Sequence, residues 1–156
     1  MDFGCYNALW SLWYLGKPNT VFATANHLRP DRFPKVEDNV NLVLTYDKGV
    51  GIFEGSWDLP RSYQDLEIFG WGDEAKRGSV YMTQKSVTMQ HGKNVEQLAI
   101  PPLEEAAGEP IAYMISRMRA KKPIEGLTAV DINVDVIHVI DVAKKSVRSG
   151  KPEKFE

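Results

Sequence analysis

Asp2 and Tyr6, close to the start of the chain, are the residues whose types and spacing point most directly to chemistry. Side chains four residues apart on an α-helix lie one turn above the other on the same face. A carboxylate beside a phenol can hold the phenol in place and receive or pass on a proton, which the interconversion of an alcohol and a carbonyl requires. The pair also fits a structural role, in which Asp2 complements the positive end of a helix dipole and Tyr6 is half-buried in a core. Spacing alone leaves both interpretations open.

The element that must position this pair is an apolar helix. Residues 3–15 are predominantly apolar, and Gly16 followed by Pro18 is typical of a helix end. No basic segment precedes this run, and it is too short to cross a membrane. We therefore expect a core helix whose bulky aromatic residues pack against a sheet: Trp10, Trp13 and Tyr14.

A two-residue alternation of apolar and polar residues follows for about eighty residues and predicts strands. Asp47-Lys48-Gly49 is typical of a hairpin turn, so neighbouring strands should be antiparallel. The polar, proline-interrupted segment 29–35 is expected to be a surface loop between two strands. The expected strands are Thr20 to Leu28, Asn39 to Tyr46, Gly51 to Trp57, Leu66 to Phe69, Ser79 to Thr83, Ser86 to His91 and Val95 to Ile100.

Two helices are expected at the C-terminal end. Glu109-Pro110 places a proline in a first helical turn, and Lys122-Pro123 ends that helix. The segment from Val130 onward alternates like a strand but also carries a helical stripe. Its length, Thr128 as an N-cap and Gly150 beyond its end favour a helix.

Composition narrows the class of protein. The 156 residues are 43% hydrophobic with a net charge of −2, which fits one globular domain spanning residues 1–156 and gives no electrostatic footprint for a nucleic acid or a membrane. The single Cys5 excludes an internal disulfide framework, which favours the cytoplasm and leaves the periplasm open. His27, His91 and His138 are far apart in the sequence, so no metal site is expected.

The order of several motifs resembles the C-terminal domain of the glucose-fructose oxidoreductase and inositol dehydrogenase family, Gfo/Idh/MocA. The resemblance covers essentially the whole chain. It rests on the following segments: Asp2-Phe3-Gly4-Cys5-Tyr6, Leu15-Gly16, Gly55-Ser56-Trp57, Leu66-Glu67-Ile68-Phe69-Gly70, Lys122-Pro123-Ile124 and Val142-Ala143-Lys144-Lys145-Ser146.

This resemblance implies an α+β fold, with an open, predominantly antiparallel sheet and helices on one face. It implies that the bare face forms a homodimer or tetramer contact. Family members use NAD or NADP, bound to an N-terminal Rossmann domain that also carries a Glu-Lys-Pro motif. No Rossmann domain is present in this chain, so we expect a fragment that corresponds to the substrate-binding half and is inactive alone.

The resemblance also assigns roles to residues. Asp2 and Tyr6 match a family motif of Asp followed four residues later by His or Tyr, so Tyr6 would exchange a proton with the substrate oxygen while Asp2 orients the substrate. Many inositol dehydrogenases have His at the position of Tyr6. The tyrosine makes this chain more similar to the branch of glucose-fructose oxidoreductases and dihydrodiol or xylose dehydrogenases. Gly4 would let a nicotinamide or substrate approach closely, or would only ease helix packing, and Tyr63 would be a substrate contact or a plain loop aromatic.

The implied activity is hydride transfer between a sugar or polyol and a nicotinamide. Two alternatives remain open from the sequence. One is a domain of an NAD-assisted glycosidase, which oxidises a sugar transiently. The other is a free-standing, non-catalytic module that binds a sugar or supports assembly.

Overall fold

The computed structural model describes residues 4–60, 64–73, 77–103 and 107–156. The chain divides into two compact units. Unit 1 comprises Met1–Asp58 and Glu109–Glu156, and unit 2 comprises Leu59–Gly108. Tyr6 and all the described helices lie in unit 1.

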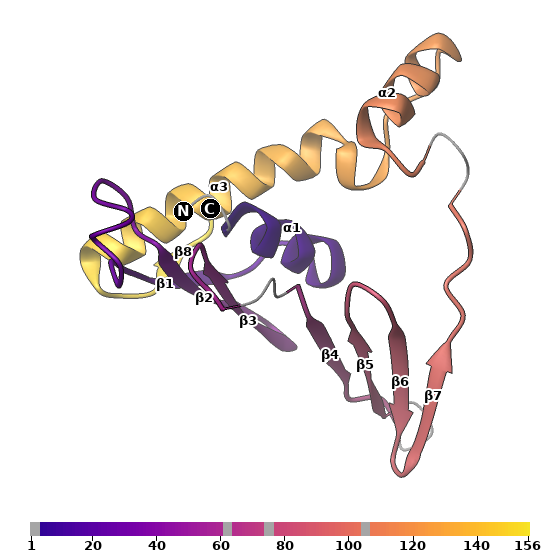
Figure 1. The fold of residues 1–156 in the computed structure, drawn as a ribbon, viewed down its shortest axis with the longest axis horizontal. Helices are drawn as coiled ribbons and strands as arrows, with labels where there is room; N and C mark the ends of the chain where they lie inside the picture. The colour runs from indigo at the N-terminus through magenta and orange to yellow at the C-terminus, as the bar shows by residue number, and fades with distance from the viewer. Residues whose placement is uncertain (1–3, 61–63, 74–76, 104–106) are drawn as a thin grey trace. The chain divides into compact units, whose positions relative to one another are not determined.

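Unit 1 contains an antiparallel sheet of four strands (Figure 1). Its order is β3 (Gly49–Ser56), β2 (Asn39–Tyr46), β1 (Thr20–Asn26) and the short β8 (Glu153–Lys154). Tyr46 pairs with Gly49, so Asp47 and Lys48 alone form the turn between β2 and β3. The predicted hairpin is therefore confirmed.

Two helices cover one face of this sheet. α1 (Gly4–Leu15) and α3 (Val130–Ser149) contact each other; α1 also packs on β2 and β3, and α3 on β1 and β8. Each ends at a glycine with a positive φ, 78° at Gly16 and 67° at Gly150, a conformation that glycine adopts without steric cost.

The core of unit 1 follows from the alternation of the strands. Every second residue of β1 and β2 is buried beneath α1 and α3, and the residues between them face away. The buried apolar side chains are Ala8, Leu12, Val21, Ala23, Val40, Leu42, Leu44, Val136, Val139, Ile140, Val142 and Ala143. The open antiparallel sheet with helices on one face, expected from the sequence, is confirmed.

The remaining helical segments of unit 1 lie between residues 109 and 129. α2 (Pro110–Arg119) begins after Glu109, whose carboxylate accepts a hydrogen bond from the N–H of Ala112 at 2.8 Å. A 3₁₀ turn, η1 (Gly126–Thr128), precedes α3. Thr128 is not the N-cap of α3, because its hydroxyl donates back to the carbonyl of Glu125 at 3.1 Å and Ala129 takes the capping position.

Unit 2 holds the second antiparallel sheet. Its strands are β4 (Leu66–Gly70), β5 (Gly78–Met82), β6 (Val87–His91) and β7 (Asn94–Leu98), each paired with the next. Leu66, Met82, Val87 and Leu98 form one row across all four strands. No helix lies among the described residues of this unit, and none of its described apolar side chains is fully buried.

The helices of the described part of the chain include none that is both long enough and apolar enough to cross a membrane.

Candidate functional site

Tyr6 lies in the first turn of α1, with 59% of its surface exposed. Its phenol is therefore accessible to a ligand. Asp2 and Tyr63, the other two side chains expected to touch a substrate, lie outside the described residues. Gly4 is the first residue of α1 and is buried, and its expected role in cofactor approach remains a prediction.

The helix that carries Tyr6 is fixed to the sheet by small residues. Ala8, Ser11 and Leu12 are the buried side of α1. The hydroxyls of Ser11 and Tyr46 share a hydrogen bond of 2.5 Å, which ties the middle of α1 to the end of β2. A side chain presented from the first turn of α1 is thus held on a rigid element, as a catalytic or binding group requires.

Gly51 lets α1 lie close to β3. A Cβ at this position would come within 3.1 Å of the Ser11 hydroxyl oxygen and within 2.6 Å of a ring carbon of Phe53. Any larger residue would force the helix, the ring or the strand to shift. The close approach also explains why a residue as small as Ser11 lies opposite Gly51.

Burial raises the pKa of the Tyr46 phenol, and the hydrogen bond with Ser11 opposes this only in part. The phenol therefore stays protonated at neutral pH. It is part-buried beneath α1 and bonded to Ser11, so we assign it a structural role, whereas Tyr6 is exposed.

The aromatic residues of α1 do not pack against the sheet, contrary to the sequence-based expectation. Trp10, Trp13 and Tyr14 are exposed by 37%, 48% and 42%. At 100° per residue they lie on the same side of the helix as Tyr6 and roughly opposite Ala8. The helix thus turns an aromatic face outward, which begins at Tyr6.

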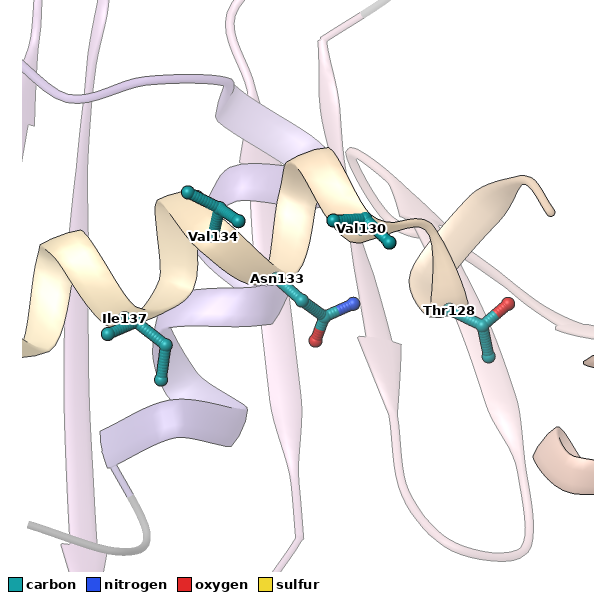
Figure 2. A pocket seen from close by; sticks show the side chains of 5 residues that line it. All are labelled: Thr128, Val130, Asn133, Val134 and Ile137. Atoms are coloured by element: carbon teal, nitrogen blue, oxygen red, sulfur yellow. The ribbon is translucent and has the colours of Figure 1, made fainter. Parts of the chain in front are cut away.

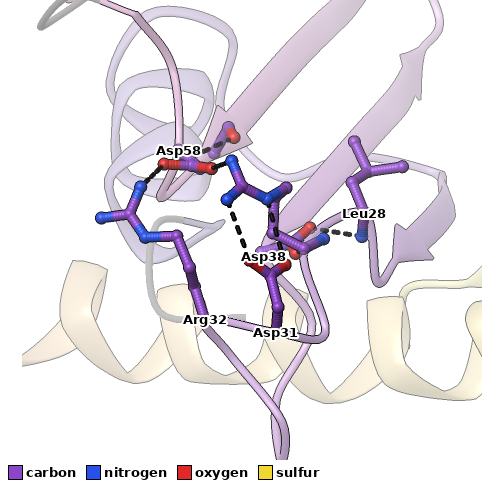
Figure 3. A network of polar contacts seen from close by, with 7 residues as sticks. Leu28, Asp31, Arg32, Asp38 and Asp58 are labelled. Atoms are coloured by element: carbon purple, nitrogen blue, oxygen red, sulfur yellow. Dashed lines mark hydrogen bonds and ion pairs between the residues drawn. The ribbon is translucent and has the colours of Figure 1, made fainter.

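The segment between β1 and β2 is organised by Asp38, which sequence reasoning missed. Asp38 is only 2% exposed, and its carboxylate accepts the N–H groups of Leu28 at 2.9 Å and Arg29 at 2.5 Å (Figure 3). Burial works against the charged form, but these two hydrogen bonds outweigh it, and the pKa of Asp38 lies below its ordinary value. This aspartate shapes the loop and has no feature of a proton donor.

The outer part of the same loop carries a network of ion pairs. The Arg29 guanidinium binds both carboxylate oxygens of Asp31, at 3.1 and 2.9 Å, and one oxygen of Asp58 at 2.9 Å. Arg32 also pairs with Asp58 (Figure 3). The hydrogen bond to Asp31 raises the pKa of Arg29 and lowers that of Asp31. Since both arginines are committed to carboxylates, they are poor candidates for binding an anion.

The three histidines have separate partners. His27 contacts the carbonyl of Phe33, and His91 contacts the carbonyl of Arg77 at 3.1 Å. His138 stacks on Phe155, with ring centroids 4.3 Å apart. Within the described ranges no three metal-binding side chains gather at one place.

A shallow hollow lies on the exposed side of α3 (Figure 2). It is lined by Thr128, Val130, Asn133, Val134 and Ile137. The amide N–H groups of Asn133 already donate to the carbonyls of Leu127 and Ala129, at 2.9 and 2.8 Å. With mainly aliphatic walls and its polar groups engaged, the hollow offers little to a polyhydroxylated ligand.

Comparison with known proteins decides the family. Residues 1–76 match the model of the GFO/IDH/MocA C-terminal domain. The predicted family is confirmed. The matched residues include the segment that carries Tyr6, all of β1 to β3 and the loop organised by Asp38. No curated protein matches the sequence at a significant level.

Solved structures of similar fold extend the likeness along the whole chain. An aldose-aldose oxidoreductase from Caulobacter crescentus, complexed with glycerol, aligns with 99% of this chain and 46% of its own at 21% identity and a TM-score of 0.75. An oxidoreductase from Thermotoga maritima aligns with 99% of this chain and 43% of its own, at 17% identity and a TM-score of 0.73. A proposed myo-inositol dehydrogenase from Sinorhizobium meliloti aligns with 99% of this chain and 49% of its own, at 20% identity and a TM-score of 0.69.

The TM-scores establish a shared fold, and at these low identities the likeness shows the fold alone. The chain spans about half the length of the solved structures that it matches. What those longer proteins bind and do therefore enters only as a proposal for this chain.

Proposed function

We propose that this chain is the substrate-binding and oligomerisation part of an NAD(P)-dependent oxidoreductase that acts on a sugar or polyol. The observation that carries the proposal is Tyr6, exposed in the first turn of a helix that belongs to the matched segment of the family domain. The fold shared with an aldose-aldose oxidoreductase complexed with glycerol supports a polyhydroxylated substrate.

In this proposal Tyr6 exchanges a proton with the substrate oxygen. A phenol on a rigid helix can donate to a carbonyl oxygen during reduction, or as phenolate accept the proton of a hydroxyl during oxidation. Asp2, four residues earlier in the sequence, would orient the substrate. The Ser11–Tyr46 hydrogen bond and the contact at Gly51 would keep the phenol in position.

We place the dinucleotide site outside the described residues. All their strand pairs are antiparallel, and they contain no parallel βαβ unit with a glycine-rich turn. NAD or NADP would supply the hydride chemistry from an N-terminal domain outside this chain. The part assigned to this chain is to bind and orient the substrate and to move its proton.

The oligomerisation part of the proposal rests on the uncovered face of the sheet in unit 1. Phe22, Val43 and Ile52 form one row across β1, β2 and β3, on the side opposite the core. Ile52 is 74% exposed. An apolar row on a face without helices is typical of a surface covered by another subunit.

The test is the Tyr6→Phe variant of the natural-length protein, with turnover followed by NAD(P)H absorbance over a panel of aldoses and polyols. We expect kcat to fall by about 10²- to 10⁴-fold, because the proton-transfer group is lost while the ring remains. Tyr113→Phe on α2 is the matched control and should leave turnover unchanged.

Other outcomes would identify the alternatives. Release of an aglycone without net NAD(P)H formation would indicate a glycosidase, and binding of sugars without any turnover would indicate a non-catalytic module. Unchanged turnover in Tyr6→Phe would remove Tyr6 from the mechanism.

A further inference from the structure

The aromatic face of α1 is larger than a single proton-transfer group needs. Tyr6, Trp10, Trp13 and Tyr14 fall within an arc of about 100° when the helix is viewed along its axis. All four are exposed. An exposed patch of large apolar side chains generally marks a binding surface.

The patch extends along the helix from Tyr6. Residues 6 to 14 span eight steps of 1.5 Å, about 12 Å along the axis. The rings of Trp10 and Tyr14 are nearly parallel, with an interplanar angle of 15° and centroids 5.9 Å apart. This stacked pair therefore continues the aromatic face from the position of Tyr6, over a length sufficient for more than one ring of a ligand.

The chemistry of the face limits what it can bind. α1 contains no charged residue in Gly4–Leu15, so none of its side chains offers an ion pair to a phosphate, a carboxylate or a cation. Indole N–H and phenol O–H groups lie at the edges of apolar rings. A sugar ring has the complementary arrangement, with C–H groups on its faces and hydroxyls around its rim.

We propose that the aromatic face of α1 binds the second ring of an uncharged saccharide whose first ring reacts at Tyr6. This inference rests on the proposed function and names its substrate class as a saccharide of two or more rings. Trp10, one turn beyond Tyr6, is the main contact for the second ring, and Tyr14 continues the surface for a longer chain.

The experiment is calorimetric titration of the natural-length protein with matched sugars: glucose with maltose and cellobiose, galactose with lactose, and xylose with xylobiose. We expect the best disaccharide to bind about five- to tenfold more tightly than its monosaccharide, the increment that one aromatic contact provides. Trp10→Ala should abolish this gain, whereas Trp10→Phe should keep most of it. Trp71→Ala, which removes an exposed indole from unit 2, is the matched control and should change neither affinity.

Equal affinities for monosaccharides and disaccharides, or a gain that survives in Trp10→Ala, would overturn this inference and leave the proposed function standing. Failure of every sugar to bind would overturn the proposed function with it. Acrylamide quenching, compared between the natural-length protein and its Trp10→Phe variant, measures access to Trp10. An inaccessible Trp10 would mean that another part of the protein covers this face, and the inference would be wrong.

Discussion

The hydroxyl groups of Ser11 on α1 and Tyr46 on β2 share a hydrogen bond of 2.5 Å, and the two residues are 35 positions apart in the chain. Ser11 is 1% exposed. The bond joins the helix that presents Tyr6 to the strand beneath it, in a part-buried place where the Ser11 side chain is shielded from water. The geometry of the candidate site therefore depends on a polar contact in the core as well as on apolar packing.

Removal of either partner of this bond should destabilise unit 1. Tyr46→Phe leaves the buried Ser11 hydroxyl without its partner, which costs about 1–3 kcal/mol, and Ser11→Ala, which leaves the part-buried Tyr46 hydroxyl, should cost less. The double variant should lose less than the sum of the two single losses, because the unsatisfied group disappears with its partner. Urea unfolding followed by tryptophan fluorescence measures the three free energies.

Tyr113→Phe is the control for this series, because the Tyr113 hydroxyl only accepts an exposed N–H of Glu125 at 3.3 Å. Its effect should be a few tenths of a kcal/mol, typical of a surface position. Strict additivity of Tyr46→Phe and Ser11→Ala would show that the two hydroxyls do not interact in solution.

The loop between β1 and β2 should loosen in acid because of Asp38. The folded-state pKa of this carboxyl is lowered, so its contribution to stability is complete above the ordinary value of 3.8 and is lost as the pH falls through the lower, folded-state value. Hydrogen exchange of the Leu28 and Arg29 amides, measured as a function of pH, should show protection that disappears in that window. Asp38→Asn should show reduced protection with no such pH dependence.

Asp141→Asn on the exposed side of α3 provides the comparison for Asp38. Its carboxylate pairs with Lys144 at 3.5 Å near the surface, far from the loop in sequence. The protection of Leu28 and Arg29 should be unchanged in that variant. A pH profile in Asp38→Asn identical to that of the original protein would assign the acid sensitivity to another group.

Much of unit 1 could be predicted because its signals are local. The alternation in Thr20–Asn26 and Asn39–Tyr46 follows from burial of one face of the sheet, and Gly16 and Gly150 end their helices as their backbone angles require. β8 escaped prediction because two residues, Glu153 and Lys154, carry no periodicity. The division of the strands into two units also escaped, because alternation shows which face a residue occupies and not which strand lies beside it.

The candidate site could be predicted only in part. The spacing of Asp2 and Tyr6 predicted a candidate pair, and the structure adds that Tyr6 is exposed. The expectation that Trp10 and Trp13 pack inward was wrong, because α1 turns Ala8, Ser11 and Leu12 toward the core instead. Helical periodicity already separates these aromatic residues from Ala8 and Ser11, but hydrophobicity alone assigns them to the core. Asp38 gave no signal, since a buried aspartate that binds backbone N–H groups has no motif of its own.

The apolar row on the uncovered face of the unit 1 sheet should determine the oligomeric state. If a second copy covers Phe22, Val43 and Ile52, an Ile52→Asp variant places an unpaired carboxylate in the contact, a change that costs about 3–5 kcal/mol. The dissociation constant should then rise by at least about a hundredfold. Sedimentation velocity of the natural-length protein over a range of concentrations measures this dissociation constant.

The matched control is Val95→Asp, on the polar side of the unit 2 sheet. Val95 is also exposed in the original chain, and the variant should associate as the original protein does. A monomeric original protein, or equal association of Ile52→Asp and Val95→Asp, would exclude this face as the subunit contact.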